Sequence, residues 1–143
     1  MKKASPPFSN SRVEEVFNNY PAAVRSRLLT IRKLIFDTAA KTPGVGKLEE
    51  TLKWAQPSYL TSETGSGTTL RIDHIPKQPG NIAVLVHCQS NIVTPFKKMY
   101  GNLFDYDGSR AIMLDHRDAL PEKEICHFIY LALTYHLRKK GKF

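Results

Sequence analysis

The residues best suited to hold a small molecule form one short segment, Lys53-Trp54-Ala55-Gln56-Pro57-Ser58-Tyr59. It contains the single tryptophan of the chain and a second aromatic residue close behind it. Aromatic side chains wall small-molecule pockets, and a polar group such as the Gln56 amide fixes a ligand by hydrogen bonds. The segment therefore predicts a binding pocket lined by Trp54, Gln56 and Tyr59. The alternative is that both aromatic residues pack in the core and at a corner of the fold.

Four further side chains are predicted as polar contacts of this pocket: Thr68, Arg71, His87 and Arg110. Two of them carry guanidinium groups, whose paired N–H donors match carboxylate and phosphate oxygens. We therefore expect an anionic small molecule as the partner. For Trp54 we expect one ring face packed on the sheet and its edge open to the pocket. The alternative for Arg71 and Arg110 is a place on a solvated sheet face.

Other chemical patterns are missing from the sequence. No two histidines stand at i, i+4 or in an HxH pair, so ligand spacing predicts no metal site. Cys88 follows His87 directly, but neighbours in a strand point to opposite faces, so we expect no nucleophile–base pair. Gly65-Ser66-Gly67-Thr68 leads into an expected strand, whereas a phosphate-binding loop precedes a helix. We predict no catalytic residue, no metal ligand and no cofactor.

Size and composition indicate one globular domain: 143 residues, 41% hydrophobic and 24% charged. The 21 Lys and Arg against 13 Asp and Glu give a net charge of +8, spread along the chain. A spread excess predicts weak attraction to polyanions and no specific nucleic-acid binding. Two cysteines without a CxxC motif predict free thiols. The absence of a signal-peptide pattern and of an apolar run of about 20 residues predicts a cytoplasmic location without a membrane partner.

Hydrophobic periodicity predicts the elements that must position these side chains. After a disordered lead-in over 1–10, two helices are expected, one from Ser11 as N-cap and one over 22–41 with Arg32 off its buried stripe. The further expectations are strands over 48–54, 68–75, 81–88 and 110–115, turns over 56–59, 76–80 and 105–108, a helix over 92–103, and a last helix from Pro121 with His136 on its inner face. The α-α-β-β-β-α-β-α order predicts an α+β domain over 11–143. Its sheet is mainly antiparallel, with about four strands and with helices packed against it.

With the elements in this order, the chain resembles the DUF1801, or YdhG-like, family over about residues 15–138. The resemblance is carried by the Trp-x-x-Pro-x-Tyr pattern within 53–59, by the strand that ends at His87-Cys88, and by Arg110-Ala111-Ile112-Met113-Leu114 followed by Leu120-Pro121. It implies a small α+β fold without established catalytic residues.

The sequence is compatible with three functions. The first is a small-ligand-binding domain that is not an enzyme. The second, implied by the family resemblance, is frataxin-like handling of iron, which the positive charge and the absence of an acidic run disfavour because iron carriers of that kind use acidic surfaces. The third is a basic accessory domain for nucleic acid, which rests on charge alone.

Overall fold

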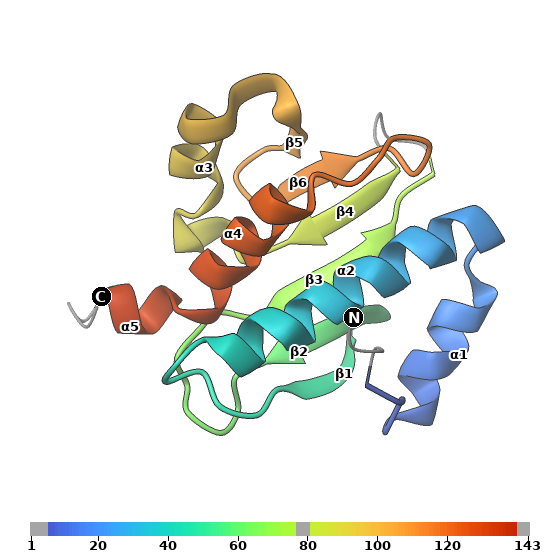
Figure 1. Cartoon of the computed structure of the whole chain (residues 1–143), viewed down its shortest axis with the longest axis horizontal. Helices are drawn as coiled ribbons and strands as arrows, with labels where there is room; N and C mark the ends of the chain where they lie inside the picture. The colour runs from blue at the N-terminus through green and yellow to red at the C-terminus, as the bar shows by residue number, and fades with distance from the viewer. Residues whose placement is uncertain (1–5, 77–80, 140–143) are drawn as a thin grey trace.

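Helices cover one face of a six-stranded antiparallel sheet in the computed structural model, which describes residues 6–76 and 81–139 (Figure 1). The elements in chain order are α1 (Ser11–Asn19), α2 (Ala22–Lys41), β1 (Glu49–Lys53), β2 (Gln56–Leu60), β3 (Leu70–His74), β4 (Ile82–Leu85), the short 3-10 helix η1 (Cys88–Ser90), α3 (Val93–Tyr100), the 3-10 helix η2 (Gly101–Leu103), β5 (Asp105–Asp107), β6 (Ala111–Leu114), α4 (Glu122–Leu133) and α5 (Tyr135–Lys139). The sheet order is β1-β2-β3-β4-β6-β5. The predicted α+β class is confirmed, with six strands in place of about four.

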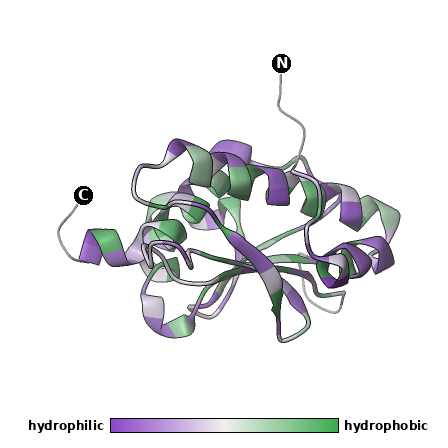
Figure 2. Cartoon of the chain, turned by 90° about the horizontal axis from the view of Figure 1, so that it is seen from below, coloured by the Kyte–Doolittle hydropathy of each residue, from purple (hydrophilic) through white to green (hydrophobic). Residues whose placement is uncertain are grey.

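The main core lies between the sheet and the pair α2 and α4, which pack side by side on the same face (Figures 1 and 2). The apolar stripe of α2 follows helical spacing, with Val24, Leu28, Ile31 and Ile35 buried. The facing stripe of α4 consists of Ile125, Phe128, Ile129, Ala132 and Leu133. The predicted bounds of the second helix are confirmed, because periodicity over five turns leaves little freedom in its register.

The other face of the sheet carries a second, smaller hydrophobic cluster to which no helix residue of the described chain belongs. It consists of Ala83, Leu85, Ala111 and Met113, with Ile75 packed against it. Their strand neighbours Ile82, Val84 and Ile112 belong to the main core, as the two-residue alternation of a strand requires. We call the side with the smaller cluster the open face.

The chain before α1 packs on the domain as far as the structure describes it. The ring of Phe8 lies 5.3 Å from that of Phe17, and residues 1–5 of the expected lead-in lie outside the described residues. The Asn10 side chain accepts hydrogen bonds from the backbone N–H groups of Arg12 and Val13 at 3.0 and 3.3 Å. Asn10 is therefore the N-cap, and Ser11, which was expected in that role, is the first helical residue.

The turn expected over 56–59 is wrong, because the chain reverses two residues earlier. Trp54 and Ala55 have φ values of 55° and 60°, the pair of left-handed residues that a two-residue hairpin turn demands. Gln56 to Leu60 then form β2, and Pro57 is tolerated because pairing with β3 begins only at Ser58. Trp54 lies at the tip of this hairpin and is 86% exposed, so the expectation that one ring face packs on the sheet is also wrong.

The structure also differs from the predicted turn over 105–108 and from the predicted inner-face position of His136. Residues 105–107 form an edge strand paired with β6, and the turn begins at Gly108, whose φ is 55°. The last helix breaks at Thr134, after which the His136 N–H donates to the Ser66 carbonyl at 2.8 Å. His136 is consequently exposed and does not lie on an inner face. Most of the connection expected over 76–80 lies outside the described residues.

Candidate functional site

The structure brings four of the seven predicted ligand contacts to the open face: Gln56, Arg71, His87 and Arg110. Gln56 and Arg71 touch directly, since the Arg71 guanidinium donates to Gln56 Oε1 at 2.8 Å. His87 follows Leu85 by two residues on extended backbone, which returns its side chain to the same face. Arg110 folds back from the turn before β6 and donates to Asp107 Oδ2 at 2.9 and 3.2 Å.

Strand register arranges the two arginines around an apolar floor. Arg71 on β3 lies opposite Leu85 on β4, and Leu85 lies opposite Ala111 on β6. Ala111 in turn lies opposite Asp107, the partner of Arg110. Leu85 is 4% exposed and Ala111 is fully buried. The result is a row with an apolar middle, a guanidinium at one end and an arginine–aspartate pair at the other.

The two guanidinium groups of this row act on each other electrostatically. Burial, and after it the positive charge of Arg110, lowers the pKa of Arg71, while Asp73 acts in the opposite direction. An anion placed between the two guanidinium groups would relieve this mutual repulsion. His87 Nδ1 accepts a hydrogen bond from the Gln89 N–H at 3.1 Å, so the neutral ring presents an Nε2–H donor.

A chain of hydrogen bonds holds Arg71 in position. Gln56 accepts from Arg71 and donates from Nε2 to Asp73 Oδ2 at 3.0 Å. The Tyr20 hydroxyl donates to the other oxygen of Asp73, also at 3.0 Å. Burial, followed by the charge of Asp73, raises the pKa of Tyr20. The sequence analysis missed Asp73, although its spacing of two from Arg71 in an expected strand placed both on one face.

The other three predicted contacts do not join this group. Tyr59 is fully buried on the helix side of β2. The Thr68 backbone N–H donates to the Ala132 carbonyl at 2.9 Å, which ties this residue to the end of α4. Trp54 stands at the hairpin tip, two residues before Gln56.

A buried polar network on the helix side was also missed. Arg32, expected off the buried stripe of its helix, is 1% exposed and forms a two-pronged ion pair with Glu50 at 2.6 and 2.9 Å. The Tyr59 hydroxyl donates to Glu50 Oε2 at 2.8 Å. Arg32 stands four residues after Leu28 and three before Ile35, so its helical spacing was the available signal. Tyr59, predicted as a ligand contact, instead holds this carboxylate.

Residues 6–76 and 81–139 show neither a metal-ligand cluster nor a membrane-spanning helix, and both cysteines are reduced. No three His, Cys, Asp or Glu side chains gather there as a group that could hold a metal ion. Cys88 and Cys126 are both free thiols, the first exposed and the second half-buried. No helix in these ranges is long and apolar enough to cross a membrane.

Comparison with known proteins gives a match at the level of the fold. No family model and no curated protein matches the sequence. The crystal structure of a DUF1801-family protein, YdhG from Bacillus subtilis, superposes with a TM-score of 0.60, over 92% of each chain, at 16% sequence identity. The chain has a YdhG-like fold. The fold implied by the Trp-x-x-Pro-x-Tyr segment is thereby confirmed. At this identity the YdhG-like fold says nothing of a ligand, which has to be argued from the side chains.

Proposed function

We propose that the domain binds a small anionic molecule on the open face, between Arg71 and Arg110. The observation that carries this proposal is the cross-strand row in which Arg71 and Arg110 lie on either side of the buried Leu85 and Ala111, close enough for the charge of Arg110 to act on Arg71. Guanidinium N–H groups bind carboxylate and phosphate oxygens in pairs, and charge-assisted bonds of this kind are stronger than neutral ones.

The two guanidinium groups of the row favour a ligand with an acidic group. Leu85 and Ala111 are almost fully buried, so binding depends on the acidic group, for which Arg71 retains donors beyond the one used on Gln56. Arg110 is partly neutralised by Asp107, so Arg71 is the main contact and Arg110 the supporting one. The His87 ring would donate from Nε2 at the far end of β4. Trp54 would offer a stacking surface to any part of the ligand that extends past Gln56.

Benzoate and benzamide test this proposal, because they share a ring and a shape and differ in charge. Titration followed by the backbone amide shifts of Arg71, Leu85 and Ala111 should show saturable binding of benzoate and much weaker binding of benzamide. Arg71→Gln should weaken benzoate by roughly tenfold or more, the equivalent of one hydrogen bond to a charged group. Arg12→Gln is the control, since Arg12 is an exposed residue of α1 and the change removes the same charge elsewhere.

Salt provides the second criterion. Binding through partly exposed guanidinium groups should weaken as ionic strength rises, because salt screens such charges. Equal binding of benzoate and benzamide, or equal loss in Arg71→Gln and Arg12→Gln, would contradict a site at Arg71.

A further inference from the structure

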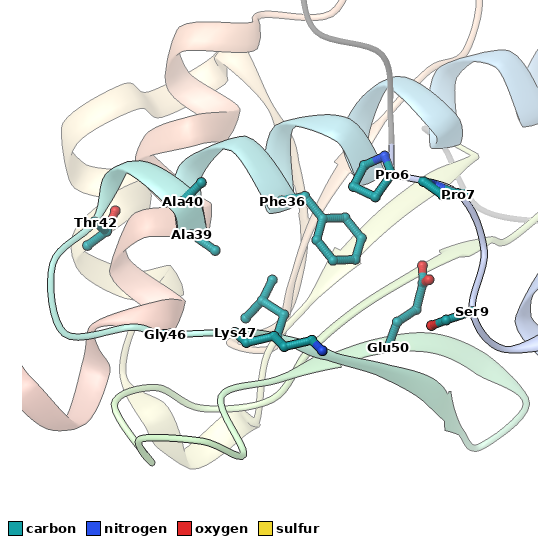
Figure 3. A pocket seen from close by; sticks show the side chains of 11 residues that line it. Pro6, Pro7, Ser9, Phe36, Ala39, Ala40, Thr42, Gly46, Lys47 and Glu50 are labelled. Atoms are coloured by element: carbon teal, nitrogen blue, oxygen red, sulfur yellow. The ribbon is translucent and has the colours of Figure 1, made fainter.

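A cavity of about 560 Å³ lies on the helix side of the sheet, away from the open face (Figure 3). It is bounded by the C-terminal half of α2, by the chain that leads into β1, and by the segment before α1. The apolar part of its lining consists of Pro6, Pro7, Phe36, Ala39, Ala40 and Leu48. Its volume falls within the range of roughly 300–1,000 Å³ typical of small-molecule sites.

One side chain gives this apolar cavity a specific chemistry. Glu50 lines it, and in Figure 3 its carboxylate points from β1 towards α2 beside Phe36. Only 3% of the Glu50 side chain is exposed. The Glu50 carboxylate can therefore accept a hydrogen bond only from a molecule that enters the cavity.

The partners of Glu50 leave one oxygen less occupied than the other. Among residues 6–76 and 81–139, Oε2 accepts from Arg32 Nε at 2.6 Å and from the Tyr59 hydroxyl at 2.8 Å, whereas Oε1 accepts only from Arg32, at 2.9 Å. A carboxylate offers about four acceptor positions, two on each oxygen. Oε1 therefore has capacity for one more donor. Because Arg32 already balances the charge of Glu50, the missing partner is a neutral donor rather than a second cation.

Arg32 also fixes the wall of the cavity opposite β1. Its guanidinium donates to the Pro6 carbonyl at 2.6 Å and lies 4.0 Å from the centre of the Phe8 ring. One buried group thus orients the Glu50 carboxylate and holds the segment of Pro6 and Pro7 in place. A site whose acceptor and wall are fixed before binding loses little conformational freedom when a ligand arrives.

We propose that this cavity binds a small neutral molecule with an apolar body and a single O–H or N–H donor, and that the donor is received by Glu50 Oε1. The site is separate from the anion site proposed above. It lies on the opposite side of the sheet, and its ligand is a neutral hydrogen-bond donor instead of an anion. Lys47, which also lines the cavity, is exposed and takes no part in this contact.

Phenol and toluene are the probes, since they have nearly the same shape and only phenol carries a donor. Each is titrated into the full chain while the amide shifts of Ala39, Leu48 and Glu50 are followed. Phenol should bind at least as tightly as toluene, although toluene leaves water more readily. Toluene binding tenfold or more tightly than phenol would overturn the role of Glu50. No shift with either probe would overturn the site.

Two variants of α2 locate the binding without touching the buried network. Ala40→Phe places a ring in the cavity and should abolish the shifts caused by phenol. Ala23→Phe makes the same change at an exposed alanine near the other end of the helix and should leave them unchanged. Equal responses of the two variants would place phenol elsewhere and reject the proposal. Arg71→Gln should affect benzoate and not phenol, so either site can fail while the other stands.

Discussion

Arg32 and Glu50 form an ion pair in which the side chains are only 1% and 3% exposed. Removing two charges from water costs several kcal/mol for each ion, and only full pairing offsets this cost. Here the two charges are paired by two hydrogen bonds, and the two groups also contact the Pro6 carbonyl, the Tyr59 hydroxyl and the ring faces of Phe8 and Phe36.

Arg32→Met should destabilise the fold strongly, because it leaves the Glu50 carboxylate buried without its cation. We expect a loss of about 3–5 kcal/mol, a large part of the roughly 5–15 kcal/mol that holds such a domain together. Urea unfolding followed by circular dichroism measures it. Lys33→Met is the control on the same helix: its pair with Asp37 is 19% and 30% exposed, so about 1 kcal/mol or less should be lost. Similar losses in the two variants would show that the buried ion pair contributes no more to the free energy of unfolding than the partly exposed pair.

Tyr59→Phe removes a single hydroxyl from the same network and leaves the packing intact. The lost hydrogen bond is to a buried carboxylate, so we expect a cost of about 1.5–3 kcal/mol. Tyr106→Phe removes a hydroxyl whose bond to the Gly101 carbonyl is exposed, and should cost less than about 1 kcal/mol. The two free energies of unfolding are compared under one set of conditions. A Tyr59→Phe protein as stable as the parent would exclude a structural role for this hydroxyl.

The hairpin tip should become more stable when its strain is relieved. Ala55 has a φ of 60°, a conformation that costs a residue with a Cβ about 1–2 kcal/mol. Ala55→Gly removes this strain and adds freedom to the unfolded chain, so the net gain should be about 0.5–1 kcal/mol. Thermal unfolding detects such a gain as a rise in Tm. A fall in Tm would mean that the Ala55 methyl group makes a contact that outweighs the strain.

The Trp54 ring should be surrounded by water in both the folded and the unfolded protein, because it is 86% exposed in the fold. Its fluorescence emission should lie at the long wavelengths of a hydrated indole and move little on unfolding. Trp54→Ala should change stability by about 0.5 kcal/mol or less, as expected for a surface position. A blue-shifted emission from the native protein would show that a contact covers the ring in solution.

The burial of Tyr20 should make the free energy of unfolding depend on pH in the alkaline range. Burial, and then Asp73, raises its pKa above the ordinary value of 10.0, so the unfolded chain ionises first. The contribution of the Tyr20 hydroxyl to the free energy of unfolding is fully present below pH 10.0. It is lost as the pH rises through that value towards the native pKa. Tyr20→Phe lacks this loss, and the stability difference between parent and variant should shrink with rising pH. A constant difference across that range would mean that Tyr20 titrates equally in both states.

How far the sequence predicts this molecule depends on the range of the interaction concerned. Helix α2 was predicted to the residue because its apolar stripe repeats locally. The turn at Trp54 and Ala55 was missed because neither residue favours a left-handed backbone, so Pro57 gave a stronger and misleading turn signal. Arg71 and Arg110 were predicted from residue type alone, and their placement on either side of Leu85 and Ala111 depends on strand register.

The Arg32–Glu50 pair shows that contacts between distant parts of the chain could not be predicted from the sequence. Its members are 18 positions apart, on a helix and a strand that meet only in the tertiary structure. Helical spacing alone could have placed Arg32 among core residues, but nothing local marks Glu50 as its partner. The cavity at Glu50 was unpredictable for the same reason, since three separate segments form its walls.

The packing of α4 on α2 has a consequence for how the chain is made. All strands of the sheet lie between these helices in the sequence, so α2 leaves the ribosome long before the helix that packs beside it. Until α4 follows, the stripe of Val24, Leu28 and Ile31 has no complete partner surface. A nascent chain at this stage exposes apolar surface of α2, and such surface is prone to association with neighbouring chains.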